Sequence, residues 1–580
     1  MTASRHRKGT SFIAAGLWLL GLSFPAGLGA APSSAVLRDE AGFIDLEPVT
    51  FHLQYGSHFH RWTLRSSEAG LWYSFHAADA DPASKPLFVF FNGGPGSATS
   101  HGLLSMYTSK YTLDNRIDGG GDAYIVNPVP WTRLGNLLHI DARQAGFSYN
   151  RMDDVGSMTS RFLEFNVQNF NPFIDGADFV RVLLRFLSLH PEIRANRVVI
   201  VGESYGGVRS IVMLHLLLNY RDYADNVEMY QDPALVAEIQ AHYDAVFPEY
   251  RGERVPPETI IRQFGHQILI QPAITMRYQN EIAPPLLLEP GSVVDQLVGQ
   301  TGIPYNPSAH GTPADYVRNV ARRDLYIYTK PANWLNAFFG KAVALLQDVG
   351  NLELVTGFDV TTVASMYASA RTRAYRVFDV NYWTNAALPL PARGISAEDD
   401  FLFLEPGRLE AASAARTAGS LPSVFGALRP WDTYFLGTNY HANWAATFFN
   451  AGKARGYETY YGFPRFGRMF LKNVAHVQTF ITNAALDLVV FSRAIPPALA
   501  RHADIVRSVR HVPESTGEAR PGKIVLDYLP AAFPDLPDIG ERTIRFPLYA
   551  ESCHAVSLTQ PLDLYEDVVA WLAEKGLRLD

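Results

Sequence analysis

The sequence has only one cysteine, Cys553, among its 580 residues, so no disulfide can form within the chain. A chain of this size must then be stabilised by its apolar core alone. If the protein is exported, the lack of disulfides fits a bacterial periplasm or secretion better than a eukaryotic endomembrane route. Internal repeats and low-complexity tracts are also absent.

An excess of basic charge is lacking as well. The chain has 50 Lys and Arg against 57 Asp and Glu, a formal net charge of -7, and no basic stripe. This balance gives no electrostatic basis for binding nucleic acid or an anionic membrane. Beyond the N-terminus no apolar run is long enough for a bilayer span, so we expect no stable membrane anchor.

The first 31 residues have the pattern of a secretory signal peptide. Arg5, Arg7 and Lys8 precede a short apolar core at 12–22, and small residues at 27–31 offer a cleavage site. The alternative is an uncleaved anchor, for which the apolar core is short. The sequence therefore predicts export to the periplasm or the extracellular space.

A strand, a sharp turn and a helix are predicted around Ser204. The apolar run 198–201 leads into Gly-Glu-Ser-Tyr-Gly at 202–206, and a helix-length apolar segment follows at 211–218. This matches the Gly-x-Ser-x-Gly nucleophile elbow of α/β-hydrolases, in which glycines allow a strained serine and a close approach of strand and helix. The alternative is a structural turn without a catalytic role.

A second glycine-rich turn follows the buried run 86–91, as Asn-Gly-Gly-Pro-Gly at 92–96. No Gly-Lys-Ser/Thr follows it, so a phosphate-binding P-loop is not indicated. In an α/β-hydrolase, an amide of this loop joins the amide after the nucleophile to form the oxyanion hole. We assign these two donors to Gly94 and Tyr205; the alternative is a plain tight turn.

Three motifs in order resemble those of the serine carboxypeptidase family. They stand at 92–96, at 202–207 and at 141–149, where Ala142-Arg143 replaces the Gln-Pro of the family pattern. The resemblance is strong from about residue 73 to 218, fades through the middle and returns near the C-terminus. It implies an α/β-hydrolase fold, a doubly wound and mostly parallel sheet with an inserted cap. The expected division is 1–31 leader, 32–274 and 431–580 core, and 275–430 cap.

The resemblance implies Ser204 as nucleophile and a general-base histidine near the C-terminus. His554 lies in His-Ala-Val-Ser-Leu-Thr-Gln-Pro, similar to the family's His-x-Val-Pro-x-x-Gln-Pro, on a loop after a predicted strand. The orienting acid should lie between them, and Asp487 is favoured over Asp527. A Cys553–His554 pair is set aside because neighbours on an extended loop point to opposite sides.

The family binds the substrate's terminal carboxylate with its motif asparagine, the glutamate before the nucleophile and a second glutamate. Asn92 and Glu203 are present, with Gly93 beside Asn92, but Met106 occupies the position aligned with the second glutamate. The resemblance therefore implies a serine-type carboxypeptidase acting on peptides. An esterase or acyltransferase on the same scaffold is the alternative that Met106 favours, and a binding protein with a relic triad is a third reading.

The rest of the chain gives weaker patterns. An antiparallel meander is predicted over 46–75, helices over 175–189, 233–247 and 332–346, and strands at 137–141, 267–270 and 543–548. His58 and His60 would share one face of a strand, but no third ligand lies nearby, so no metal site is predicted. No cofactor is expected.

Overall fold

The central strands are apolar on both faces, which is typical of a sheet covered by helices on both sides. In β5 (Leu87–Phe91) and β10 (Val198–Glu203) every residue is buried. Side chains alternate along a strand, so the odd-numbered residues of β5 join one core and the even-numbered residues the other. The sequence thus produces one sheet between two separate apolar cores.

The computed structural model describes part of the chain, and all that follows refers to that part. The described ranges are 37–55, 60–66, 68–93, 99–100, 102–113, 124–143, 147–151, 172–225, 232–275, short pieces between 278 and 310, 464–513 without 486, 488 and 489, and 522–577 without 551 and 553. The expected leader, the expected helix at 332–346 and most of the expected cap lie outside these ranges.

Eleven of the described strands form one sheet, in the order β1-β4-β8-β5-β10-β11-β12-β16-β15-β14, with β9 paired to β4. Neighbours from β8 to β16 are parallel, and the pairs at both ends are antiparallel. The further bounds are Glu40–Leu46 (β1), Glu68–His76 (β4), Asn136–Ile140 (β8), Tyr149–Arg151 (β9), His266–Ile270 (β11), Gln478–Ile481 (β12), Val506–Val512 (β14), Lys523–Tyr528 (β15) and Glu541–Arg545 (β16). The predicted mostly parallel, doubly wound sheet is confirmed.

The chain reverses its direction across the sheet between β5 and β10. From β5 it moves to β8 on one side, and then returns past β5 to β10 on the other. In open α/β sheets, ligands bind beyond the carboxyl ends of the strands at such a reversal. Asn92 directly follows β5, and Ser204 directly follows β10, so the two motif turns meet at this point.

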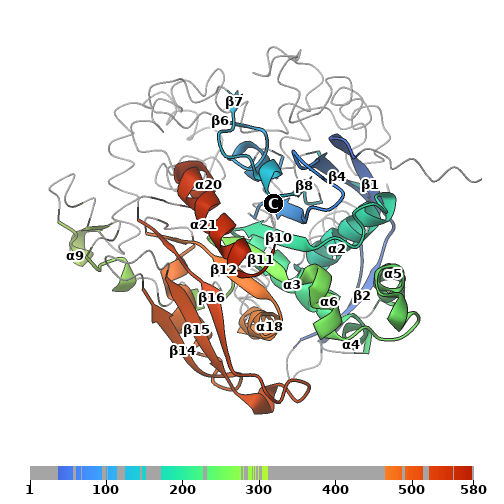
Figure 1. Ribbon diagram of the computed structural model, residues 1–580. Coiled ribbons are helices and arrows are strands. Elements are labelled where there is room, and N and C mark those ends of the chain that lie inside the picture. The colour runs from blue at the N-terminus through green and yellow to red at the C-terminus, as the bar shows by residue number, and fades with distance from the viewer. Residues whose placement is uncertain are drawn as a thin grey trace, which may run out of the picture. The chain divides into compact units, whose positions relative to one another are not determined.

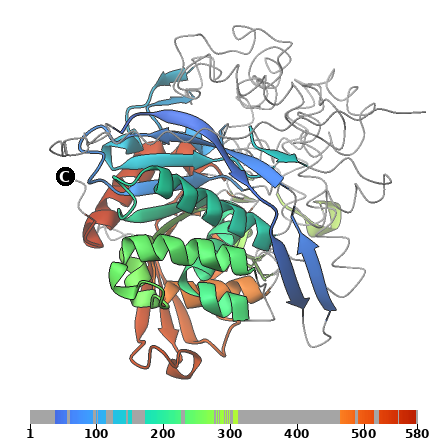
Figure 2. The same ribbon diagram turned by 90° about the vertical axis from the view of Figure 1, so that its right-hand side faces the viewer.

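Helices cover both faces of the sheet (Figures 1 and 2). Residues of α2, α3, α5, α6 and α18 share one core, whereas residues of α21 pack in the other. The bounds are Pro172–Leu189 (α2), Gly206–Leu218 (α3), Tyr220–Asp225 (α4), Pro233–Val246 (α5), Pro257–Phe264 (α6), Pro307–His310 (α9), Pro464–Val474 (α18), Ile495–Leu499 (α19), Val556–Thr559 (α20) and Pro561–Glu574 (α21). No helix among the described residues is long and apolar enough to cross a membrane.

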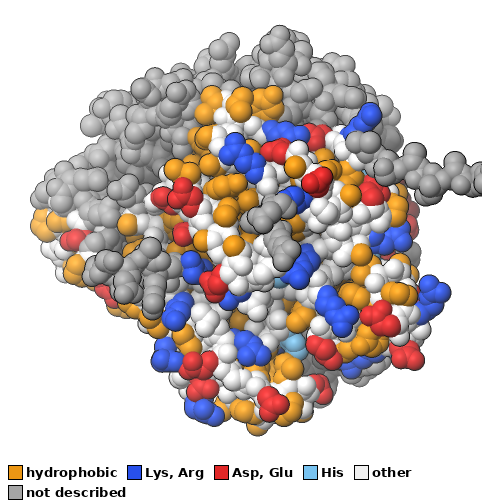
Figure 3. All heavy atoms as spheres, viewed as in Figure 1, with side chains coloured by type: hydrophobic (Ala, Val, Ile, Leu, Met, Phe, Trp, Pro, Cys, Tyr) orange, Lys and Arg blue, Asp and Glu red, His pale blue; other side chains and the backbone are white. Residues whose placement is uncertain are grey.

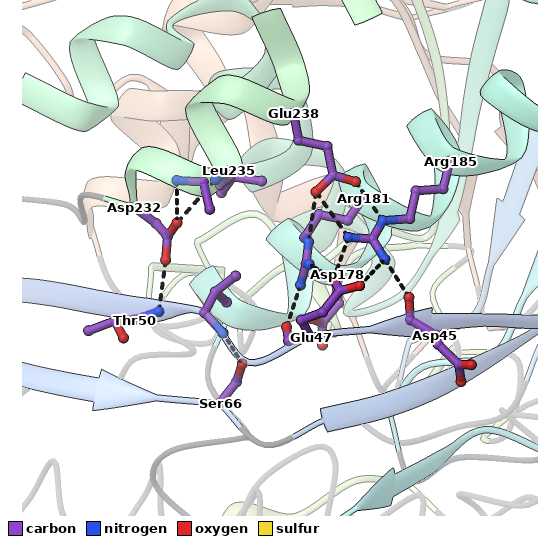
Figure 4. A network of polar contacts seen from close by, with 12 residues as sticks. Asp45, Glu47, Thr50, Ser66, Asp178, Arg181, Arg185, Asp232, Leu235 and Glu238 are labelled. Atoms are coloured by element: carbon purple, nitrogen blue, oxygen red, sulfur yellow. Dashed lines mark hydrogen bonds and ion pairs between the residues drawn. The ribbon is translucent and has the colours of Figure 1, made fainter. Parts of the chain in front are cut away.

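The meander expected over 46–75 is wrong in its connectivity. β1 and β4 pair with each other in the main sheet, whereas β2 (Thr50–Tyr55) and β3 (His60–Arg65) form a hairpin of their own. The chain leaves the sheet after β1 because polar groups hold the start of the hairpin elsewhere. The Thr50 amide donates to Asp232, which also caps α5, at 2.7 Å (Figure 4). Two short pairs complete the strands: β6 (Tyr111–Leu113) with β7 (Tyr124–Val126), and β13 (Asn483–Ala484) with β17 (Leu548–Tyr549).

An ion-pair cluster ties the outer side of α2 to β1 and α5 (Figure 4). Arg181 and Arg185 of α2 each contact Glu47, just after β1, and Glu238 of α5, at 2.6–3.1 Å. The hydrogen bonds from Arg185 hold the pKa of Glu47 at about 2, against the opposing effect of burial. On the face in Figure 3, the described acidic and basic side chains are interspersed.

The chain enters and leaves its long middle segment at neighbouring positions. Thr275 follows β11 by a few residues, and Gly467 lies in the first turns of α18. A methyl carbon added to Gly467 would lie 2.5 Å from Thr275 Cγ2. Thr275 and Gly467, which stand on either side of residues 276–466, are therefore in contact.

Candidate active site

Ser204 lies in a strained turn between β10 and α3. Its φ is +59°, in the left-handed region that non-glycine residues rarely adopt. Backbone bonds on both sides hold this conformation: the Ser204 amide donates to Ile270 at 2.9 Å, and its carbonyl accepts from Ala273 at 2.8 Å. The turn presents the serine beyond the carboxyl end of β10.

The glycines of this turn are required by close packing. A Cβ at Gly202 would lie 2.6 Å from the Gly206 oxygen, and one at Gly206 would lie 3.1 Å from the Phe91 oxygen. The same test at Gly207 gives 2.5 Å to the Ala273 oxygen. Strand, turn and helix therefore approach each other as a nucleophile elbow requires.

The loop after β5 lies directly against the elbow. A Cβ at Gly93 would lie 2.4 Å from the Tyr205 amide nitrogen and 2.6 Å from the Glu203 oxygen. The Tyr205 amide, one expected oxyanion donor, thus lies beside the glycine-rich loop. Gly94, the other expected donor, lies outside the described residues.

The structure brings Asp487 and His554 together. His554 Nδ1 lies 2.8 Å from Asp487 Oδ2, and both residues are buried. Burial favours the neutral imidazole, but the charge and hydrogen bond of Asp487, helped by Glu203, raise the pKa of His554 overall. The Val490 amide donates to the other Asp487 oxygen at 3.1 Å. Asp527, the rival acid, lies on β15 and pairs with Arg507 at 3.2 Å.

Glu203 connects the elbow to this pair. Glu203 is 6% exposed, accepts from Asn92 Nδ2 at 3.3 Å through Oε1, and has no hydrogen-bond partner at Oε2 among the described residues. Burial raises the pKa of Glu203 to about 7; His554 and Asn92 oppose the rise, and Asp487 adds to it. Glu203 directly precedes Ser204 and lies close enough to His554 and Asp487 to interact electrostatically with both, so it links the elbow to this pair.

Asn92 is fixed on three sides. Its Oδ1 accepts from the Leu103 amide at 2.7 Å, its own amide donates to Thr99 Oγ1 at 3.1 Å, and its carbonyl accepts from Arg209. A Cβ at Gly102 would lie 2.2 Å from Asn92 Oδ1, so this glycine leaves room for the side chain. Asn92 is therefore held in place to donate to Glu203.

Met106 is buried and directly follows the 3-10 turn Leu103–Ser105, whose first amide binds Asn92. The next residue, Tyr107, has a φ of +58°. Non-glycine residues with positive φ number four among the described residues: Asp81, Tyr107, Ser204 and Gln271. Ser204 and Gln271 lie in the site and Tyr107 lies near Asn92, in keeping with the tendency of backbone strain to gather where function requires it.

Two residues of the site were missed in the sequence. Gln271 donates to Asp487 Oδ2 at 2.7 Å from the turn after β11. Arg209 of α3 is buried, binds Asp175 of α2 at 2.8 and 3.1 Å, and stacks 4.2 Å from the centre of the Phe179 ring. An arginine and an aspartate within two apolar helix patterns were the available signal for Arg209; Gln271 left none.

A small hollow borders Asp487. Its described lining combines the segment after β12 with pieces of the expected cap: Leu286, Leu287, Ser292, Ala484, Ala485, Asp487, Phe491, Ser492 and Arg493. Arg493 pairs with Glu289 at 2.6 Å, which joins the two segments. The described part of 275–430 thus lies next to the site.

No group of three or more potential metal ligands occurs among the described residues. His58, the side chain of His60 and Cys553 lie outside them.

Part of the chain is similar in sequence to known proteins. Residues 50–229 match the family model of serine carboxypeptidases. Two Arabidopsis thaliana relatives, serine carboxypeptidase-like 20 and 25, are 25% identical over 182 residues (31% of this chain, 33% of the relative) and 31% identical over 163 residues (28% and 31%). The mouse lysosomal protective protein is 28% identical over 151 residues, 26% of each chain.

The matches span about a third of the length of the curated relatives. Among solved structures, a prohormone-processing carboxypeptidase from Saccharomyces cerevisiae aligns over 91% of both chains, with 12% identity and a TM-score of 0.40. The strand order, the elbow and the family match give the α/β-hydrolase fold. Over residues 50–229, about a third of its length, the chain is similar to the serine carboxypeptidase family.

Proposed function

We propose that the protein is an exported serine carboxypeptidase-like hydrolase that cleaves C-terminal residues from peptides through Ser204, Asp487 and His554. The observation that carries the proposal is the 2.8 Å contact of His554 with Asp487, linked through Glu203 to the strained elbow of Ser204. A buried carboxylate on one imidazole nitrogen leaves the other nitrogen to act as a base. This is the arrangement that a serine nucleophile needs.

In the proposed reaction, Ser204 Oγ attacks the acyl carbon while His554 Nε2 takes its proton. The Tyr205 amide, with that of Gly94, donates to the oxyanion. His554 then protonates the leaving amine, and an acyl-enzyme remains on Ser204. Water, deprotonated by His554, attacks this ester and releases the acid. Asp487 keeps the proton on Nδ1 and stabilises the imidazolium in both steps.

Glu203 and Asn92 are proposed to bind the terminal carboxylate of the peptide, beside the Gly93 backbone. The unpartnered Oε2 of Glu203 and a pKa of about 7 make a protonated carboxyl available below neutral pH. A protonated carboxyl can donate to a carboxylate, whereas an ionised one repels it. Recognition of the substrate should therefore weaken as pH rises through 7.

The second candidate is an esterase or acyltransferase. Met106 favours it, because a buried thioether at that position cannot share a proton with Glu203 as a second carboxyl would. Such an enzyme would use the same triad on an acyl group that carries no free carboxylate.

Two measurements on one preparation test the proposal. A fluorophosphonate probe should label the wild type, and Ser204→Ala should abolish the labelling. A peptide and its C-terminally amidated twin should then differ in kcat/KM, with the free acid favoured and the preference falling above pH 7. Equal rates on both would remove the carboxypeptidase reading and leave a general acyl hydrolase. An unlabelled wild type would refute the triad.

A further inference from the structure

Gln271 lies between the elbow and the triad acid, in a conformation that its surroundings impose. It directly follows β11, is fully buried and has a φ of +45°. Its backbone amide donates to Thr482 Oγ1 at 2.9 Å. A buried glutamine in the left-handed region is unfavourable unless the fold gains something from it.

The side-chain amide of Gln271 can adopt only one orientation. Its Oε1 accepts from the Ala484 amide at 2.8 Å and from the Thr482 hydroxyl at 3.1 Å. The Ala484 N–H can only donate, so the side-chain oxygen of Gln271 must face it, and the Thr482 hydroxyl then donates to the same oxygen. Turning the amide over would set its NH₂ against the Ala484 N–H. Nε2 is thereby directed at Asp487.

Nε2 donates to Asp487 Oδ2 at 2.7 Å, and this is the oxygen that His554 Nδ1 contacts at 2.8 Å. The two donors therefore share one carboxylate oxygen, while Val490 binds the other. Among the described residues, no hydrogen bond joins the Gln271 side chain to Ser204. Its contact with the triad is through the acid alone.

We propose that Gln271 is a positioning residue, which holds the Asp487 carboxylate in line with His554 and moderates its pull on the imidazole. This inference rests on the proposed triad but not on the peptide specificity. A neutral donor takes part of the negative charge of Oδ2, so that the imidazolium formed during the reaction can release its proton to the leaving group. Loss of the donor should strengthen the hold of Asp487 on protonated His554.

The sharpest variant is Gln271→Glu, which keeps an acceptor for Ala484 and Thr482 and changes only the donor that faces Asp487. Two carboxyls at this distance share a proton, so at acid pH the variant retains a donor and at alkaline pH it repels Asp487. We expect the labelling rate by a fluorophosphonate, divided by that of the wild type, to fall at least tenfold from pH 5 to pH 8.

Gln267→Glu is the matched control. Gln267 lies on the same strand, is equally buried and donates to Thr479 Oγ1 at 2.9 Å, away from the triad. Gln267→Glu adds a buried carboxyl as Gln271→Glu does, but not beside Asp487. Its labelling rate divided by that of the wild type should therefore not change with pH. Asp487 and Glu203 are the charged groups that face His554, and Glu203 is unchanged in all variants, so its titration cancels in each ratio.

If Gln271→Glu does not fold, Gln271→Met gives the neutral test. The labelling rate should begin to fall at a higher pH on the acidic side than in the wild type, because His554 holds its proton more tightly. A ratio for Gln271→Glu that does not change with pH, or an acidic fall for Gln271→Met that begins at the same pH as in the wild type, overturns the inference. Labelling that behaves as expected without any peptidase activity leaves the inference standing and removes the carboxypeptidase proposal. A wild type that is not labelled overturns both.

Discussion

The two sides of the candidate site are satisfied in different ways. On the serine side, formed by Asn92, Gly93, Glu203 and Ser204, a buried carboxyl oxygen lacks a partner and its acid titrates near neutral pH. On the acid side, formed by Gln271, Thr482, Asp487 and His554, both Asp487 oxygens and the Gln271 amide are bonded.

The difference lies in which hydrogen bonds the protein forms by itself and which ones only a bound ligand could form. A saturated network keeps one geometry, because each alternative would leave a buried group unpaired. A buried oxygen without a partner is costly until another molecule supplies one. The acid side is therefore a fixed support, whereas the serine side is where the proposed function requires substrate to bind.

Breaking the acid side should have the largest effect. We expect Asp487→Asn to lower kcat by about 10⁴-fold. An amide in this place stabilises the wrong imidazole tautomer, and it does not carry the negative charge that stabilises the imidazolium. Single-turnover acylation with an activated ester measures it. Asp527→Asn, on β15 and paired there with Arg507, is the control and should stay within twofold of the wild type.

Gly93→Ala should disturb the serine side by about 10²-fold or more in kcat. The new Cβ meets two backbone atoms, Tyr205 N and Glu203 O, so the loop must move away from the amide that donates to the oxyanion. Gly540→Ala meets nothing within 4 Å and serves as the matched control. An active Gly93→Ala enzyme with an unchanged fold would show that this loop does not form the oxyanion hole.

Glu203→Gln should change the pH dependence more than the rate. In the wild type, kcat/KM for a peptide with a free carboxylate should fall about tenfold per pH unit above 7, as Glu203 ionises. Glutamine donates at all pH values, so the fall should disappear in the variant. The amidated peptide supplies the control, since neither enzyme should show this fall with it.

The same substitution should alter stability with a definite sign. The folded pKa of Glu203 is raised from 4.5 to about 7, so its contribution is fully present below 4.5 and is lost as pH rises through 7. Relative to Glu203→Gln, the wild type should lose about 3 kcal/mol of unfolding free energy between pH 4.5 and 8. Urea unfolding at both pH values measures this, and an equal difference at both would contradict the assigned titration.

The ion-pair cluster on α2 gives the smallest expected effect and lies outside both sides. Glu238→Gln should cost about 1 kcal/mol, and Glu47→Gln less, because the Glu47 side chain is 68% exposed and screened by solvent. The pKa of Glu47 is about 2 instead of 4.5, so its contribution is complete above 4.5 and is lost as pH falls through 2. Fluorophosphonate labelling at 25 °C should not change in either variant.

The fold could be predicted where the pattern is local. Buried runs at β5 and β10 and the apolar spacing of α2 produced elements within a few residues of those observed. The outermost strands β14 and β15 were not expected. β14 carries exposed and charged residues such as Arg507 and Arg510, which give no buried-strand signal at an edge.

The serine side was likewise within reach of the sequence, because its residues lie in two short motifs. Asp487 and His554 could be predicted only from the order of the triad residues in α/β-hydrolases and from the position of each residue on a loop. Gln271 could not be found in this way: its partner lies 216 residues away, and its contact depends on the parallel pairing of β11 with β12.

The contact of Thr275 with Gly467 has a consequence for how such an enzyme can change. A segment whose flanking residues touch each other can be shortened, lengthened or replaced without moving Ser204 away from Asp487 and His554. Selection can then alter what the enzyme accepts in the middle of the gene while the machinery on either side of it is inherited intact.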